Sequence, residues 1–187
     1  MFPLSILPLP GELVPLHIFE PRYKQLLQDA ESDDISFGIF FNSTINTEKI
    51  GSLMKLESVI KRYPAGESDI IVRCYDVFIM DTLYRTFKSK MYPGGDVNLA
   101  ETDLNEMGGS KLTELFLEYL TKRNITRQQS LYGVYSIAQE LSLELNDRYT
   151  FLLADEANRI SFLIQRIKYQ LQILSREEKS KDVFHLN

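Results

Sequence analysis

Few side chains in this sequence have the chemistry of a catalytic centre, and the first of them lie in residues 14–23, VPLHIFEPRY. This stretch holds His17, one of only 2 histidines, followed by Glu20 and Arg22. Nucleophilic catalysis needs a nucleophile, a base and an orienting group together. Because His17 has no Ser, Cys or second His beside it in the sequence, we expect a structural role for it. A small hydrolase that uses His17 or Cys74 is the less favoured alternative.

The remaining chemistry-bearing residues give no catalytic or metal-binding pattern. Cys74 is the only cysteine, which excludes an internal disulfide and a cysteine zinc cluster. It falls among Val72 and Phe78 in an apolar run, so we expect a buried, inert thiol. His185 lies in the polar tail and cannot be placed from sequence. No HExxH, GxSxG or GxxxxGK[ST] pattern occurs, and we therefore expect no catalytic residue, no metal and no cofactor.

Composition narrows the class of partner. The chain of 187 residues has a net charge of −5 and a pI of about 5.2, which disfavours nucleic acid and anionic membranes. No apolar run is long enough to span a bilayer. The N-terminus lacks a basic region, and prolines interrupt it, so it does not resemble a signal peptide. These features predict a cytoplasmic protein that does not insert into membranes.

The elements that must position these residues fall into two predicted parts, 1–105 and 106–187. In the first part, apolar and β-branched runs predict short strands at 3–8, 14–19, 35–41, 50–63, 69–80, 83–92 and 97–100. The segment 50–63 alternates imperfectly, which indicates a bulge or a strand buried on both faces. One short helix should begin at Pro21, because Tyr23, Leu26, Leu27 and Ala30 share one helical face. Strands and turns in this order predict a closed or nearly closed β-barrel.

The second part predicts a helical bundle. Leu112, Leu115, Phe116, Tyr119 and Leu120 form one apolar stripe of a first helix. A second helix is expected from Thr126 to Leu145, and a short third helix from Asn146. The last helix should be long, roughly 155–179, with apolar residues at alternating gaps of three and four. The predicted class is α+β, with a β-barrel that contains one short helix and a C-terminal helical bundle that ends in a long helix.

Several motifs resemble one known family. FPL near the start, LPGELVPLHIFEPRYKQLL, Phe37-Gly38-Ile39 and Ile50-Gly51-Ser52-Leu53 together resemble the N-terminal, substrate-binding domain of the ATP-dependent protease Lon. The resemblance implies a PUA-like β-barrel with a helical bundle and a role in binding polypeptide. The chain contains neither the ATPase nor the protease module of that family, so a free-standing, non-catalytic domain is expected.

The resemblance also suggests that VPLHIFEPRY is architectural. We expect His17, Phe19, Glu20, Pro21, Arg22 and Tyr23 to form a structural motif. In it, Pro21 starts the helix and Tyr23 anchors it, with Phe19 and Tyr23 on a core face. Glu20 and Arg22 should form an ion pair or bind backbone groups around the Pro21 turn.

The leading hypothesis is a non-catalytic module that binds exposed or unfolded polypeptide, or one specific protein partner. Ligand sites favour junctions between parts of a fold, so a groove between barrel and helices is expected. Its candidate liners are amphipathic aromatic residues near element ends: Phe40, Tyr63, Tyr84, Tyr92 and Tyr132. RNA binding through a local basic patch is the alternative, with Lys61, Arg62, Arg73, Arg85, Lys88 and Lys90 as its residues. The oligomeric state is left open, with a homo-oligomer as one alternative.

Overall fold

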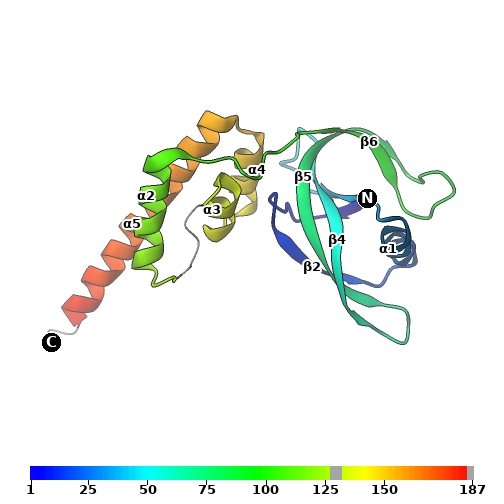
Figure 1. Cartoon of the computed structure of the whole chain (residues 1–187), viewed down its shortest axis with the longest axis horizontal. Helices are drawn as coiled ribbons and strands as arrows, with labels where there is room; N and C mark the ends of the chain where they lie inside the picture. The colour runs from blue at the N-terminus through cyan, green and yellow to red at the C-terminus, as the bar shows by residue number, and fades with distance from the viewer. Residues whose placement is uncertain (127–131, 185–187) are drawn as a thin grey trace. The chain divides into compact units, whose positions relative to one another are not determined.

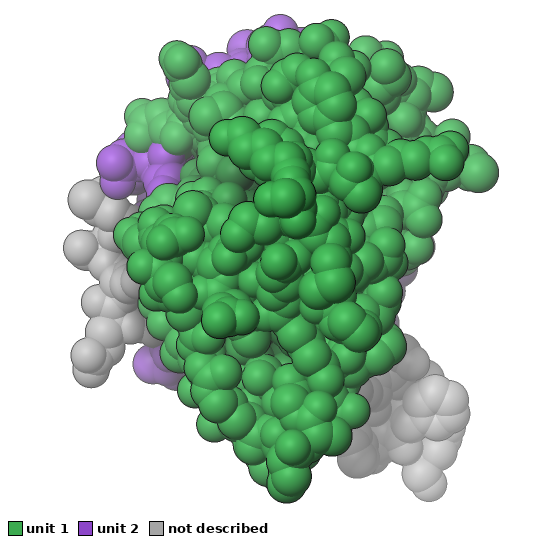
Figure 2. Space-filling model, turned by 90° about the vertical axis from the view of Figure 1, so that its right-hand side faces the viewer, with its two compact units in different colours: residues 1–103, 144–149 green, residues 104–143, 150–187 purple. Residues whose placement is uncertain are grey.

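The structure is a computed structural model that describes residues 1–126 and 132–184 (Figure 1). The chain divides into two compact units, coloured separately in Figure 2. Unit 1 contains residues 1–103 and 144–149, and unit 2 contains residues 104–143 and 150–187. His185 lies outside the described residues. The proposal that 1–105 and 106–187 are separate domains stays a prediction.

Unit 1 is built on one mixed sheet of six strands. They are β1 (Phe2–Leu4), β2 (Leu13–Ile18), β3 (Phe37–Phe41), β4 (Ile50–Arg62), β5 (Ser68–Tyr84) and β6 (Gly94–Leu99). The order is β1-β3-β4-β5-β2, and β6 also pairs with β5. Among the described strands, the β1–β3 pair is parallel and the others are antiparallel. At 17 residues, β5 is long enough to take β2 along its first part and β6 along its last part.

The six described strands do not close into a barrel, so the closed form of the predicted closed or nearly closed barrel is wrong. Closure would require β1 to join β2 or β6, but within the described strands β1 pairs with β3 alone, and β2 and β6 pair with β5 alone. β1 is only 3 residues long, which leaves few backbone groups for a second partner. The α+β class is confirmed, and the PUA-like assignment stays a prediction.

Two further strand predictions have different outcomes. The predicted bulge in 50–63 is confirmed, because the β4–β5 register shifts at three places between Leu53 and Lys61. The predicted strand 83–92 is wrong: β5 continues to Tyr84, and residues 85–93 form a loop to β6. In this loop the Phe87 N–H donates to the Tyr92 carbonyl (3.3 Å), and Lys88 has a positive φ of 47°. A left-handed residue turns the chain and cannot continue a strand.

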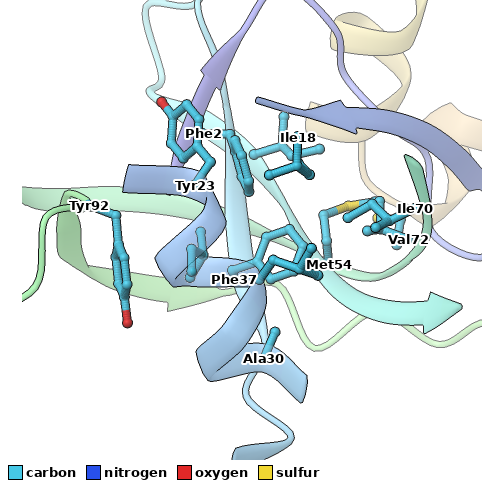
Figure 3. Close-up of a cluster of buried hydrophobic side chains, with 13 residues drawn as sticks. Phe2, Ile18, Tyr23, Ala30, Phe37, Met54, Ile70, Val72 and Tyr92 are labelled. Atoms are coloured by element: carbon cyan, nitrogen blue, oxygen red, sulfur yellow. The ribbon is translucent and has the colours of Figure 1, made fainter. Parts of the chain in front are cut away.

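Helix α1 (Pro21–Asp33) covers the core of unit 1. Pro21 is its first residue, as predicted, because its fixed φ suits this position and its missing N–H needs no partner there. The predicted apolar face of α1 is also confirmed: Tyr23, Leu26, Leu27 and Ala30 are all buried. They pack with Phe2, Ile18, Phe37, Met54, Ile70 and Val72 (Figure 3).

The segment 144–149 belongs to unit 1 through polar contacts that reach across the sequence. The Arg148 guanidinium binds both carboxylate oxygens of Glu12, at 2.6 and 3.1 Å, and donates to the Leu7 carbonyl at 3.2 Å. The Tyr149 hydroxyl lies 3.2 Å from Thr47 Oγ1. A bidentate pair of this kind fixes geometry as well as adding energy.

Unit 2 is helical. It contains α2 (Gly109–Lys122), α3 (Val134–Glu140), the end of α4 (Leu145–Leu153) and α5 (Glu156–Phe184). The predicted second helix is shorter than expected: Gly133 is extended and bridges to Met107, and the Val134 N–H bonds to the Glu106 carbonyl. Helices α2 and α5 pack together, which agrees with a packed bundle helix. In the described part of the chain, no helix is both long and apolar enough to cross a membrane.

Candidate functional site

Unit 1 contains an apolar cavity of about 230 Å³. Its walls come from α1, from the start of β3, from β4, β5 and β6, and from the loop 85–93. The large apolar side chains around it are Met1, Leu26, Phe37, Phe78, Phe87 and Tyr92. Cavities that hold a drug-sized ligand measure about 300–1,000 Å³, while roughly 150 Å³ of apolar space is enough for a benzene ring. The cavity is therefore the size of one large apolar side chain.

Two glycines determine where the Phe78 ring lies in this cavity. A Cβ at Gly38 would lie 2.9 Å from the ring, and a Cβ at Gly51 would lie 2.3 Å from it. Phe78 is nearly fully buried, so its ring occupies the space that side chains at these two positions would fill. The glycines of the Phe37-Gly38 and Ile50-Gly51 pairs are therefore required because the Phe78 ring packs against them.

The loop 85–93 is attached to α1 by polar contacts. The Tyr92 hydroxyl donates to Asp29 at 2.7 Å, and the Lys90 ammonium donates to the same carboxylate at 2.9 Å. The Met91 N–H donates to the Gln25 side chain at 2.8 Å. The hydrogen bond from Tyr92, with that from Lys90, holds the pKa of Asp29 below its usual value. Burial, with the adjacent carboxylate, raises the pKa of Tyr92. These contacts hold one wall of the cavity in place.

The cavity has an exposed apolar margin. Phe87 is 36% exposed and Met91 is 54% exposed on the loop. Leu83, which is 52% exposed, pairs with Gly95 of β6. Residues directly opposite each other in a sheet point to the same face, as do residues two apart on one strand. Leu83 therefore shares a face with Val97, which lines the cavity. Apolar side chains that stay exposed beside an apolar hollow are typical of a binding surface.

A second cluster lies at the other end of β5 and involves His17. Its Nδ1 atom is 2.6 Å from one Asp69 oxygen, and the Tyr63 hydroxyl donates to the other at 2.7 Å. The Tyr63 hydrogen bond, followed by that from His17, lowers the pKa of Asp69. The same bond to the carboxylate raises the pKa of Tyr63. Phe19 stacks on His17 with ring centroids 6.0 Å apart, and it is 58% exposed.

This second cluster corrects one prediction and leaves another without support. Phe19 does not lie on a core face, because residues 13–19 alternate and odd positions point outward. The cluster contains a base and an acid, but the Tyr63 hydroxyl bonds to Asp69 and not to His17. The described hydrogen bonds of His17 therefore include no nucleophile that it could activate.

The five predicted groove residues do not form one site within either unit. Tyr92 is a wall of the cavity, and Phe40 packs against the adjoining cluster of Met1, Phe78 and Met80. Tyr84 is exposed and donates to Asp96 at 2.6 Å. Tyr63 belongs to the His17–Asp69 cluster, and Tyr132 packs edge-on against Phe116 in unit 2.

Two of these residues are buried within their own units: Tyr92 is 6% exposed and Tyr132 is 3% exposed. Each ring has aromatic or apolar neighbours that cover it. The groove between the two halves of the chain stays a prediction.

Other sequence predictions concern single residues. Cys74 is fully buried, and burial raises the pKa of its thiol to about 12, so it is inert at neutral pH. Arg22 Nε donates to Glu20 at 2.9 Å across Pro21, which confirms the predicted ion pair. Tyr23 is buried, as predicted for a core position. Among the described residues, no group of three or more His, Cys, Asp or Glu could hold a metal ion.

Sequence reasoning missed Phe87 and Asp69. Phe87 was placed in a strand that does not exist, although the Gly94-Gly95 pair indicated a close approach of the chain nearby. A Cβ at Gly94 would in fact meet the Phe87 side chain at 2.7 Å. Asp69 gave no signal, because nothing in the sequence shows that it pairs with His17.

Comparisons with known proteins agree with this architecture. The family model described as "ATP-dependent protease La (LON) substrate-binding domain" matches residues 1–180. The crystal structure of a Lon N-terminal domain protein from Xanthomonas campestris is similar, with a TM-score of 0.69 and 22% identity, covering 88% of this chain and 95% of that one.

The N-terminal domain of the Mycobacterium avium complex Lon protease has a TM-score of 0.64 and 16% identity, covering 90% of this chain and 96% of that one. At such identities these two likenesses show the fold alone. No curated protein sequence matches the chain. The family match covers nearly the whole sequence, and the chain belongs to the ATP-dependent protease La (LON) substrate-binding domain family.

Proposed function

We propose that this chain binds polypeptide segments without cleaving them, and that the cavity of unit 1 holds an apolar side chain of the bound segment. Family membership supports the general role in substrate binding. The observation that carries the choice of surface is the apolar cavity of about 230 Å³, whose lining residue Phe87 is partly exposed. Exposed Leu83 lies on the same face of the sheet, and exposed Met91 belongs to the same loop as Phe87. The proposal includes a cytoplasmic location, which the lone free thiol favours.

The cavity has room for one large apolar side chain, and this limits the affinity that it can provide. Burying one Leu or Phe side chain contributes about 1.5–3 kcal/mol. This corresponds to about 10- to 150-fold in affinity, at 1.4 kcal/mol per factor of ten. One anchor therefore gives weak, reversible binding unless neighbouring residues also contact the margin. Weak binding of this kind suits a module that samples many exposed apolar segments.

A tryptophan placed over the cavity tests this proposal. Ser36 lines the cavity and is exposed, so Ser36→Trp should fill or cover the hollow while leaving the core intact. The matched control is Ser58→Trp, an exposed serine on β4 that does not line the cavity. Binding of a fluorescent unfolded polypeptide should weaken at least tenfold in Ser36→Trp and stay unchanged in Ser58→Trp. Equal affinity in both variants and the wild type would exclude the cavity as the site.

The two alternative functions have less support. Of the six basic residues predicted to form an RNA-binding patch, Arg62 pairs with Glu31, Arg73 with Glu57 and Lys90 with Asp29. Carboxylates at these positions cancel the field that phosphates require. A hydrolase based on Cys74 conflicts with a buried thiol whose pKa is raised to about 12.

A further inference from the structure

The loop beside the cavity is strongly basic in an acidic chain. Residues 85–93 read RTFKSKMYP, with three cations and no carboxylate, while the whole chain has a net charge of −5. Asp29 neutralises Lys90. Within the described part of the chain, neither Arg85 nor Lys88 forms an ion pair. The Lys88 ammonium lies 5.0 Å from the centre of the Phe87 ring, which lines the cavity.

The strand next to this loop has an edge that can accept another strand beyond its start, where the Met1 ammonium donates to the Pro93 carbonyl at 2.9 Å. β6 pairs with β5, and within the described residues no strand pairs with its second edge. Every other residue of β6 therefore turns its backbone N–H and C=O away from β5. Gly95 and Val97 of β6 line the cavity. A segment added along this edge would point the side chains opposite these two residues toward the cavity face.

We propose that the ligand of the cavity is an extended polypeptide segment that pairs with the free edge of β6, with an apolar anchor in the cavity and an acidic side chain near the anchor bound by Arg85 and Lys88. Extended geometry follows from the strand edge, and backbone bonds of this type give affinity without sequence preference. The acidic preference follows from the two unpaired cations. This inference rests on the proposed function and assigns a ligand class to the same cavity.

Reversing the charge in the peptide and, separately, in the protein tests the acidic preference. The probes are short fluorescent peptides with one Leu anchor in a Gly/Ser background and Asp, Asn or Lys two residues from the anchor, on either side. An Asn peptide with a free C-terminal carboxylate, compared with its amide, separates a side-chain acid from a chain terminus. Exposed ion pairs are each worth about 0.2–1 kcal/mol. We therefore expect the Asp peptide to bind about three- to tenfold more tightly than the Lys peptide at low salt.

The protein variants supply the decisive comparison. Arg85→Glu/Lys88→Glu should reverse the preference, so that the Lys peptide binds more tightly than the Asp peptide. The matched control is Lys61→Glu on the β4–β5 hairpin, which should keep the wild-type preference. An unchanged preference in the double variant overturns the acidic assignment. A gain from the free C-terminal carboxylate alone would also overturn it, in favour of a chain terminus as the ligand.

Backbone methylation tests the strand pairing. Methylating the peptide amides one at a time should weaken binding at every second position near the anchor, because alternate amides face β6. Equal tolerance at all positions would exclude pairing with this edge. If the peptides bind, Ser36→Trp abolishes binding and neither charge nor methylation matters, the proposed function stands and this inference fails. If no Leu peptide binds the wild-type chain, both fail.

Discussion

Replacing Gly38 by alanine tests whether the Phe78 ring is held in the position that shapes the cavity. A Cβ at residue 38 would lie 2.9 Å from Cε1 and Cζ of Phe78, and its next neighbour, Met1 Cγ, is 3.7 Å away. Phe78 is 1% exposed and packs with Met1 and Met80, so a ring displaced from residue 38 would have to move into the cavity or against these neighbours. Overpacking of this kind costs about 1–3 kcal/mol. We expect Gly38→Ala to lower the free energy of unfolding of unit 1 by that amount.

The effect of Gly38→Ala on the free energy of unfolding should have the opposite sign once the Phe78 ring is removed. In a Phe78→Leu background no ring atom remains near residue 38, and Gly→Ala at an unstrained position stabilises by about 0.4–1 kcal/mol. The predicted coupling between the two positions is therefore at least about 1.4 kcal/mol. Gly51→Ala is the matched control, because its Cβ would also lie 2.7 Å from the Ile39 carbonyl oxygen. It should stay destabilising in both backgrounds.

The chain has no tryptophan whose fluorescence could follow the unfolding of unit 1. Hydrogen exchange is therefore the suitable measurement. Exchange of β3 and β4 amides at increasing denaturant gives the free energy of opening of unit 1, whatever unit 2 does. The double-mutant cycle then isolates the contact between residues 38 and 78. If Gly38→Ala costs the same with Phe78 and with Leu at position 78, the ring is not fixed by the glycine and the reasoning is wrong.

Three further predictions follow from burial and hydrogen bonding. Tyr23→Ala should lower the free energy of unfolding by about 3–5 kcal/mol, whereas Phe19→Ala should change it by less than about 0.5 kcal/mol, as denaturant titration will show. Cys74 should not react with a thiol reagent at neutral pH until denaturant is added, because burial raises its pKa to about 12; rapid labelling of the native protein would contradict this. The hydrogen bond from Tyr92 lowers the pKa of Asp29, so this carboxylate contributes stability above its unfolded pKa of 3.8 that is lost as the pH falls. Tyr92→Phe should reduce that acid-induced loss of stability. Identical profiles of stability against pH for the variant and the wild type would contradict this.

Elements with strong local signals could be predicted from the sequence. Pro21 and the spacing of Tyr23, Leu26 and Leu27 determine where α1 begins and which face it buries. The aromatic, β-branched run at β3 needs no long-range information either. The prediction of the sheet was wrong at its ends. Whether a sheet closes depends on which strand edges meet and not on the strand propensity of any one segment.

The candidate site was less predictable for a physical reason. Residues 83–92 contain enough Tyr, Thr and Phe to indicate a strand. A left-handed Lys88 and the contacts from Lys90 and Tyr92 to Asp29 instead bind this segment to α1 as a loop. These contacts join residues about sixty positions apart, and a single sequence does not show such pairs.

The polar cluster of His17 and Asp69 and the apolar cavity can be tested separately, because they lie along different parts of the long strand β5. Asp69 lies at the start of β5, where it pairs with His17 of β2, and Phe78 lies nine positions later, where β5 pairs with β6. At about 3.3 Å per residue, some 30 Å of strand separates them. A single side chain in the cavity therefore cannot contact His17. Asp69→Asn should leave peptide binding at the cavity unchanged, and Ser36→Trp should leave the His17 environment unchanged in NMR spectra. If Asp69→Asn alone abolished peptide binding, the ligand would be bound by the His17 cluster and the cavity would be a packing feature.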